Sequence, residues 1–199
     1  MKILIATMNK GKIKEFQKII PENKGVEILR LTDLSIKNDV EETGNSFADN
    51  AFIKASYYQN ISNTPTVSED SGLEIEALDG EPGVYSARYG GTKLTDDERV
   101  DLVLKKLRNV PKIKRKAKFI SVICGIGFKP EPIFCTGVLN GFISEKKEGK
   151  NGFGYDPIFL PERKKITTAS MTIEQKNNIS HRKKSIDKFL KVLITDKII

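Results

Sequence analysis

The sequence predicts an α/β fold, a long mixed central sheet flanked by helices, in two lobes with a cleft between them. Two observations favour it. Strand-like and helical segments alternate along most of the chain, and the apolar segments 119–128 and 133–138 have the spacing of an antiparallel pair. At 199 residues the chain can bury a core without disulfides or metal, so we expect one two-lobed domain over residues 1–199.

The first third of the chain predicts two strands and two helices. Residues 2–6 are a short apolar run that leads into a polar turn. A helix is expected over 12–20, because Ile13, Phe16, Ile19 and Ile20 fall on one face before Pro21 stops it. Residues 26–29 predict a second strand, and 46–59 predict a second helix with a buried stripe of Phe47, Ala51, Ala55 and Tyr58.

The remainder continues the alternation. Residues 66–68 predict a short strand that runs into the stretch E-D-S-G-L, with strand resuming over 73–77. Thr95 and Glu98 form a capping box for a helix reaching Arg108. The last helix is expected to begin near Ser180 and to bury Ile186, Phe189, Leu190 and Leu193.

Composition narrows the class of protein. The apolar run at the N-terminus is too short for a signal peptide or membrane span, so we expect a cytoplasmic protein without membrane contact. Cys124 and Cys135 lie in apolar segments without metal-ligand spacing, which predicts reduced core thiols. The net charge of +8 permits a nucleic-acid-binding module, but the lysines are scattered and lack aromatic platforms. A solvated basic surface is the favoured interpretation.

The turn between the first strand and helix is a candidate phosphate site. A polar, glycine-containing turn before a helix presents backbone N–H groups and the positive end of the helix dipole to an anion. Lys12 adds a full charge, and the spacing is not that of a Walker A loop. The candidate residues are Thr7, Met8, Asn9, Lys10, Gly11 and Lys12.

A second group is rich in carboxylates. Glu69 and Asp70 follow a buried strand, where a rigid element can hold ligands for Mg²⁺, which prefers oxygen. Glu41 and Glu42 occupy a loop, and for that pair alone a solvated surface is the favoured interpretation. Asn50 and Lys54 share a helix face, so Lys54 either faces the acidic loop or covers the edge of the core.

Two further motifs suggest base recognition. In G-F-G-Y-D-P, residues 152–157, two glycines allow close approach, Phe153 and Tyr155 can stack on a base, and Asp156 can accept from a ring N–H. In S-H-R, Ser180 is a candidate N-cap that places His181 and Arg182 in a first helical turn, where an anion or electron-rich ring would favour them. A structural turn is the competing interpretation of the first motif, and a structural histidine is the competing interpretation of the second.

Together these motifs resemble the inosine triphosphate pyrophosphatase family, whose bacterial members include the XTP/dITP diphosphatases and Ham1-like proteins. The resemblance runs nearly end to end through six segments in order: T-M-N-K-G-K, E-E-T-G-N-S-F-A-D-N-A-F-I-K-A, S-E-D-S-G-L, G-E-P-G-V-Y-S-A-R-Y-G-G, G-F-G-Y-D-P-I-F and K-N-N-I-S-H-R. Met8 and Glu69 depart from the pattern, standing where many relatives have glycine and aspartate.

The resemblance implies an active site for non-standard purine nucleoside triphosphates (ITP, dITP and XTP) and a homodimer. Asp70 would be the catalytic carboxylate and a Mg²⁺ ligand, with Glu41, ahead of Glu42, as the expected second carboxylate. Residues 7–12 and Lys54 would hold the triphosphate, and Ser71 would touch the substrate. The base and sugar side would comprise Phe153, Gly154, Tyr155, Asp156, Lys176, His181 and Arg182.

The implied chemistry is hydrolysis to the nucleoside monophosphate and pyrophosphate. The alternatives are a Maf-like pyrophosphatase acting on other modified nucleotides, a basic nucleic-acid-binding module, and a catalytically silent nucleotide sensor. The nucleic-acid hypothesis leaves the four carboxylates unexplained, and a sensor predicts no release of pyrophosphate.

Overall fold

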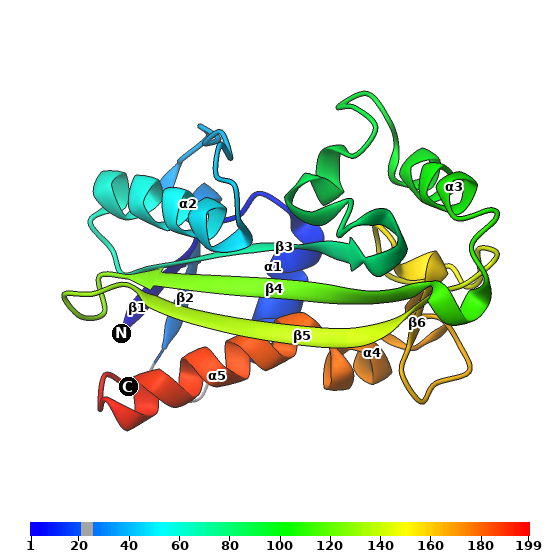
Figure 1. The fold of residues 1–199 in the computed structure, drawn as a ribbon. Helices are drawn as coiled ribbons and strands as arrows, with labels where there is room; N and C mark the ends of the chain where they lie inside the picture. Colours follow the sequence, from blue (N-terminus) through cyan, green and yellow to red (C-terminus); the bar gives the residue numbers. More distant parts are fainter. Residues whose placement is uncertain (21–25) are drawn as a thin grey trace. The chain divides into compact units, whose positions relative to one another are not determined.

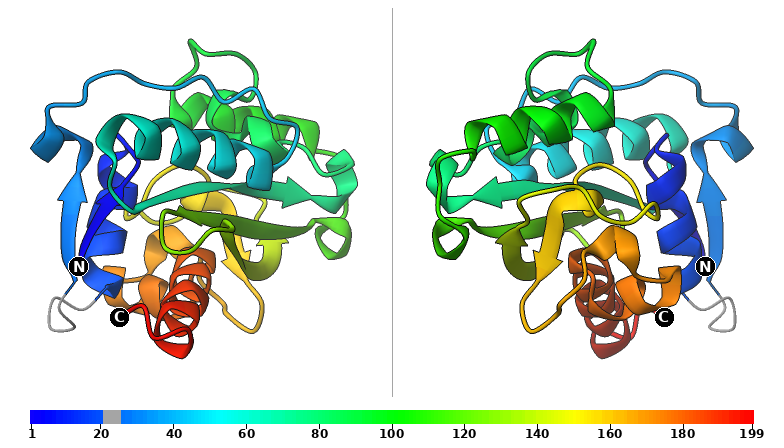
Figure 2. Two further views of the ribbon diagram at one scale, coloured as in Figure 1. Left: turned by 90° about the vertical axis from the view of Figure 1, so that its left-hand side faces the viewer. Right: turned by 90° about the vertical axis from the view of Figure 1, so that its right-hand side faces the viewer.

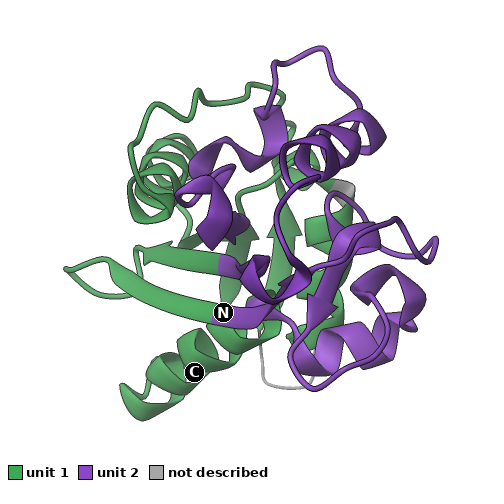
Figure 3. Cartoon of the chain, turned by 45° about the vertical axis from the view of Figure 1, so that its right-hand side comes forward, with its two compact units in different colours: residues 1–70, 121–137, 182–199 green, residues 71–120, 138–181 purple. Residues whose placement is uncertain are grey.

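The computed structural model describes residues 1–20 and 26–199, which form two compact units (Figure 3). Unit 1 comprises residues 1–70, 121–137 and 182–199, and unit 2 comprises residues 71–120 and 138–181. Pro21, expected to stop the first helix, lies outside the described residues.

Within the described ranges the sheet has six strands, in the order β2-β1-β3-β4-β5-β6 (Figure 1). The strands are β1 (Lys2–Ile5), β2 (Glu27–Arg30), β3 (Thr66–Ile75), β4 (Lys116–Ile126), β5 (Ile133–Ile143) and β6 (Phe159–Pro161). β1 pairs in parallel with β2 and β3, whereas β5 and β6 are antiparallel. The predicted mixed sheet is therefore confirmed.

Five α-helices are described, and local sequence explains where most begin. They are α1 (Lys10–Ile19), α2 (Phe47–Ser62), α3 (Asp96–Lys106), α4 (Ile173–Ile179) and α5 (His181–Thr195). The capping box of Thr95 and Glu98 is confirmed at α3. A second box, Thr172 with Gln175, begins α4, a helix that the sequence analysis missed although the T-x-x-Q pattern was present.

Unit 1 packs helices against both faces of its strands (Figures 1 and 2). Alternate residues such as Ile3, Ile5 and Val67 join a core with Phe16 of α1 and Phe189 of α5. On the opposite face α2 covers the strands, and its Ala51, Ala55 and Tyr58 pack against residues that include Leu4, Ala6 and Cys124. Because successive side chains point to opposite faces of a strand, each strand residue of unit 1 packs against the helices on one face of the sheet only.

β3 corrects the expectation of two strands interrupted at E-D-S-G. The structure has one ten-residue strand, Thr66–Ile75, buried along almost its whole length. A strand covered on both faces needs no alternation of apolar and polar residues, and its polar side chains find partners within the protein. Glu69 and Asp70 therefore lie inside a strand rather than after one.

Unit 2 has its own apolar core. It draws on the ends of β3, β4 and β5 in this unit, on β6, and on α3, which supplies Val100 and Val103. Tyr155 and Ile158 enter the same core from the segment before β6. The loop that carries G-F-G-Y-D-P is thus anchored by its own side chains.

The remaining differences concern element ends and burial. α1 begins two residues before the expected start because Asn9 caps it, and β5 extends to Ile143. Leu190 is only partly buried, whereas the other three residues predicted for the core face of α5 are buried. Both cysteines are buried and free, as predicted. Among the described residues, no helix combines the length and apolar character needed to span a bilayer.

Candidate active site

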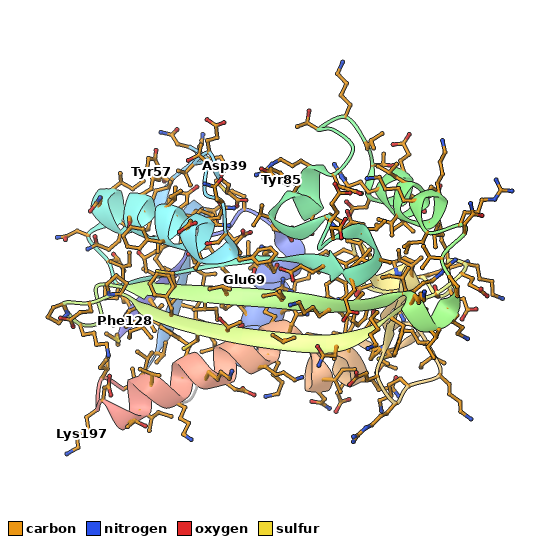
Figure 4. All side chains as sticks on the ribbon, in the orientation of Figure 1. Asp39, Tyr57, Glu69, Tyr85, Phe128 and Lys197 are labelled. Carbon is orange, nitrogen blue, oxygen red and sulfur yellow. The ribbon has the colours of Figure 1, made fainter. Side chains whose placement is uncertain are left out.

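Glu69 and Asp70 on β3 are the centre of the candidate site in unit 1, and they face opposite sides of the strand. Consecutive strand residues point in opposite directions, so the two carboxylates meet different helices. Glu69 is directed to α1 and α5, and Asp70 to α2. Both are almost fully buried, with 1% and 5% of their surface exposed. Figure 4 labels Glu69 on the strand.

On the α2 side, Asp70 meets an amide and an amine. Asn50 Nδ2 donates to Asp70 Oδ2 at 3.1 Å, and Lys54 Nζ lies 3.7 Å from Asp70 Oδ1. The same amine donates to Glu42 Oε1 at 2.5 Å and to the backbone oxygen of Glu69 at 2.9 Å. Lys54 therefore faces the acidic loop, and the structure brings Glu42 to it, while Glu41 is exposed.

On the other side, Glu69 is held by two cations. Lys12 Nζ lies 2.7 Å from Glu69 Oε2, and the guanidinium of Arg182 binds Glu69 Oε1 through Nη2 at 3.1 Å. Arg182 also pairs with Glu15 of α1, and its side chain is almost wholly buried. The first turn of α5 is thus tied to β3 and α1 by charge-assisted hydrogen bonds.

Burial changes the proton affinity of two groups in this cluster. Loss of solvent raises the pKa of Asp70, and the nearby amines of Lys54 and Lys12 oppose that rise. Burial also lowers the pKa of Lys12, against the opposing attraction of Glu69. Burial therefore disfavours the charged form of each group. A cation bound beside Asp70 would stabilise the ionised carboxylate, and an anion bound beside Lys12 would stabilise the protonated amine.

The donor set fits Mg²⁺. Among the described side chains, the cluster holds four carboxylates and three cations, namely Glu15, Glu42, Glu69 and Asp70 against Lys12, Lys54 and Arg182. This leaves one excess negative charge, with oxygen as the available ligand atom. Within the described ranges no group of three acidic, histidine or cysteine side chains could hold a metal by itself. Mg²⁺ typically uses one or two carboxylates and takes its other oxygens from phosphates and water.

The expected phosphate turn is built around Asn9. Its side chain caps α1 by accepting from the N–H groups of Gly11 at 2.9 Å and Lys12 at 3.1 Å, and Thr7 Oγ1 accepts from the N–H of Asn9. Met8 is exposed. Lys10 begins α1, and its side chain lies outside the described part. The cap fixes the start of the helix from which Lys12 reaches β3.

In unit 2, Asp156 is the hub of a second polar cluster. Its Oδ2 accepts from Lys176 Nζ at 2.5 Å and from the N–H of Phe153 at 2.9 Å, while Oδ1 accepts from Thr168 Oγ1 at 2.8 Å. Only 2% of Asp156 is exposed. Its carboxylate thus holds the glycine-rich loop and the amine of Lys176 together.

The aromatic residues of this loop have different surroundings. Phe153 is partly exposed, and Lys176 Nζ lies 4.8 Å from the centre of its ring. Tyr155 instead points into the core, where its hydroxyl donates to the backbone oxygen of Ser86 at 2.9 Å. His181 stacks on Phe119 with ring centres 4.9 Å apart. Phe153 therefore offers an accessible ring, while Tyr155 anchors the loop.

Gly152 should be intolerant of a side chain. Its φ is +79°, and a Cβ there would lie 2.0 Å from Asp156 Oδ2. We expect Gly152→Ala to lower the free energy of unfolding by more than 2 kcal/mol, because it adds a clash with a fixed carboxylate to backbone strain of about 1–3 kcal/mol.

Gly154→Ala is a matched control for this experiment. Gly154 also has a positive φ, +58°, but an added Cβ would have no atom within 4 Å. Denaturant unfolding of both variants separates strain from collision. Equal losses would contradict the contact with Asp156.

Three residues of these clusters had no site role in the sequence analysis. Glu15 lies one helical turn from Lys12 on α1, and that i, i+3 spacing was the available signal. Asn50 was noticed only for sharing a face with Lys54. Thr168 lies in a short 3₁₀ helix far along the chain from Asp156, and local pattern carries no signal for that contact.

Ser71 is half-buried and follows Asp70 on β3. Lys176 and His181 are buried, and the latter is the first residue of α5, as predicted. Gly154 donates its N–H to Asp96 at 3.2 Å.

Comparison with known proteins gives consistent matches over nearly the whole length of the chain. A model of the Ham1 family matches residues 3–192. A dITP/XTP pyrophosphatase of Oceanobacillus iheyensis is 45% identical over 196 residues, covering 98% of each chain, and one of Bacillus subtilis is 39% identical, covering 96% of each. Among solved structures, the Ham1 protein of Staphylococcus aureus aligns with a TM-score of 0.88 and 39% identity, over 98% of this chain and 100% of that one. A HAM1 protein from Coxiella burnetii gives 0.89 and 38%, over 98% and 99%.

Proposed function

Because the chain belongs to the Ham1 family, we propose that it is a nucleoside triphosphate pyrophosphatase that converts ITP, dITP and XTP to the nucleoside monophosphate and pyrophosphate. The names of its relatives support the substrate class. The observation that carries the proposal is the buried cluster of Lys12, Lys54 and Asp70 around β3. It combines cations suited to a triphosphate with a carboxylate suited to metal binding and proton transfer.

Unit 1 binds the triphosphate and cleaves it. Lys12 and Lys54 bind phosphate oxygens and stabilise the charge that develops on the pyrophosphate leaving group. The residues around the cap of α1, Thr7 to Gly11, line the phosphate side, and Ser71 touches the substrate.

Asp70 prepares the nucleophile. It orients a water molecule and accepts its proton as the water oxygen attacks the α-phosphorus, and the bond from that phosphorus to the bridging oxygen of the pyrophosphate breaks. Mg²⁺, held by Asp70 and by Glu42 or Glu41, supplies charge neutralisation on the phosphate oxygens when bound. Glu42 is favoured because it shares Lys54 with Asp70.

Base selection depends on donors facing the 6-position of the purine. Hypoxanthine and xanthine have a 6-oxo acceptor there, which Lys176 or His181 can serve. Adenine has a 6-amino donor and would leave such donors unpaired, at about 1–3 kcal/mol for each buried group. Phe153 stacks on the base, while Gly154, Tyr155 and Asp156 shape the loop. Arg182 is the last of the residues proposed for the base and sugar side, although its guanidinium already pairs with Glu69 and Glu15.

The assembly and location expected from the resemblance, a homodimer in the cytoplasm, belong to this proposal. Size-exclusion chromatography with light scattering tests the dimer directly.

Pyrophosphate release from ITP, dITP, XTP, GTP and ATP tests the function. We expect rapid release from the first three with Mg²⁺, loss of release with EDTA, and little release from ATP. Guanine shares the 6-oxo group, so sparing of GTP requires the pocket to exclude the 2-amino group. A Maf-like enzyme would instead act on modified pyrimidine nucleotides. If none of the five purine substrates releases pyrophosphate with Mg²⁺, the proposed reaction is wrong.

A further inference from the structure

Asn50 of α2 joins the two acidic segments of unit 1. Its side chain is fully buried, with 0% of its surface exposed. Nδ2 donates to Asp70 Oδ2 at 3.1 Å, and Oδ1 accepts from the backbone N–H of Gly44 at 2.8 Å. One amide thus binds β3 at Asp70 and the loop that carries Glu41 and Glu42.

The surroundings of Gly44 are independent evidence that the loop of residues 41–44 lies close to α2. A Cβ at residue 44 would lie 2.5 Å from the Cβ of Asp49, 2.7 Å from Asn50 Oδ1 and 2.9 Å from the backbone nitrogen of Asn50. Two of these three atoms cannot move without moving α2 itself. The loop therefore packs directly on the first turn of α2, and only glycine leaves room for it.

The chemistry of the amide suits this position. A side-chain amide is both donor and acceptor, so it can serve a carboxylate and a backbone N–H at once. Because it is uncharged, it orients Asp70 without cancelling the negative charge that a metal needs. Lys54 lies nearer the other oxygen of the carboxylate, Oδ1.

We infer that Asn50 is a positioning residue that fixes the separation between the loop of residues 41–44 and the carboxylate of Asp70, and so sets the geometry in which both meet a divalent cation. This inference rests on the proposed function, since it concerns the same metal and carboxylates. Residues that orient metal ligands typically contribute a factor of about 10–100 in metal affinity or activity.

The principal test is Asn50→Leu, which keeps the approximate shape and removes both hydrogen bonds. We expect Mn²⁺ affinity, measured by paramagnetic resonance without nucleotide, to fall about 10–100-fold. Amide hydrogen exchange at Gly44 should accelerate, and kcat should fall while the KM for ITP changes less than about threefold. Asn60→Leu is the matched control, an exposed asparagine on the same helix, and should leave all three quantities unchanged.

A double-mutant cycle, with Tm as the readout, tests the inference if Asn50→Leu does not fold. Asn50→Asp keeps the acceptor for Gly44 but sets a second carboxylate against Asp70. It should lower Tm in the natural background and have little effect in Asp70→Asn, whose new amide can donate to residue 50. Additive effects in this cycle would overturn the inference, as would unchanged Mn²⁺ affinity and Gly44 exchange in Asn50→Leu.

The two proposals can fail separately. If the natural protein releases no pyrophosphate yet Mn²⁺ binding and Gly44 exchange depend on Asn50, the positioning role stands and the reaction is wrong. If pyrophosphate is released but Mn²⁺ binding and Gly44 exchange are unchanged in Asn50→Leu, the proposed reaction stands and the positioning role is wrong.

Discussion

Asp70→Asn should reduce kcat for ITP hydrolysis by about 10²–10⁴-fold, the range expected when a general base is removed. The substitution is nearly isosteric, and the new amide can remain in contact with Asn50, so the fold should persist. Steady-state pyrophosphate release and a circular-dichroism spectrum check the two statements together. Substantial residual turnover would remove Asp70 from its proposed role.

The same variant should be more stable than the natural protein when metal is absent. Burial raises the pKa of Asp70, so the ionised carboxylate opposes folding at neutral pH. A raised pKa in the folded state contributes stability at low pH that is lost as pH rises through that pKa. The Tm advantage of Asp70→Asn should therefore be largest near pH 7 and shrink as the pH falls toward 4.

Added Mg²⁺ should reverse the order. Binding to the folded natural protein raises its Tm by mass action, and the variant lacks the ligand. Asp79→Asn serves as a control, since that carboxylate is exposed in a turn. A variant that is less stable than the natural protein at pH 7 in EDTA would show that the carboxylate is stabilised rather than strained by its surroundings.

Arg182→Met should have the largest effect on stability. It removes the cation that lies between Glu69 and Glu15 and leaves both carboxylates buried with fewer partners. Breaking a buried ion pair costs about 3–5 kcal/mol. For a chain of this length that corresponds to a fall in Tm of roughly 6–20 °C.

Arg108→Met provides the comparison for this experiment. Arg108 is exposed, and a surface substitution of this kind usually changes stability by less than about 0.5 kcal/mol. Glu69→Gln added to Arg182→Met should recover part of the loss by removing one stranded charge. Equal melting temperatures for Arg182→Met and the natural protein would mean that the ion pairs add no net stability.

The fold was accessible from sequence where the relevant information is local. Apolar spacing and capping residues located α1, α2, α3 and α5 to within a few residues, and the Thr95–Glu98 box marked the start of α3. β3 was predicted as strand only over 66–68 and 73–77, because the polar residues between them interrupt the apolar pattern, and burial on both faces leaves no alternation to contradict that interpretation. Such a strand is identified by its neighbours in the sheet, which local pattern does not contain.

The same distinction between local pattern and contacts of distant residues applies to the candidate site. The residue types of the phosphate turn and carboxylate segments could be read directly, because their chemistry is in the side chains. The partners of those residues could not. Arg182 meets Glu69 across 113 positions and Glu15 across 167, and Asn50 meets Asp70 across 20. For Tyr155 the residue type itself was ambiguous, because an aromatic side chain in a glycine-rich loop can either stack on a base or pack into a core. In the structure it packs into the core of unit 2.

The opposed orientations of Glu69 and Asp70 make the order of this dipeptide as important as its composition. Exchanging the two residues would preserve total charge and total volume, yet it would present the shorter carboxylate to Lys12 and Arg182 and the longer one to Asn50. A shift of one position in the pairing of β3 would do the same to every side chain on the strand. Each carboxylate is therefore matched to partners on its own side of the strand, and a length change anywhere in β3 would disturb more of these contacts than most single substitutions.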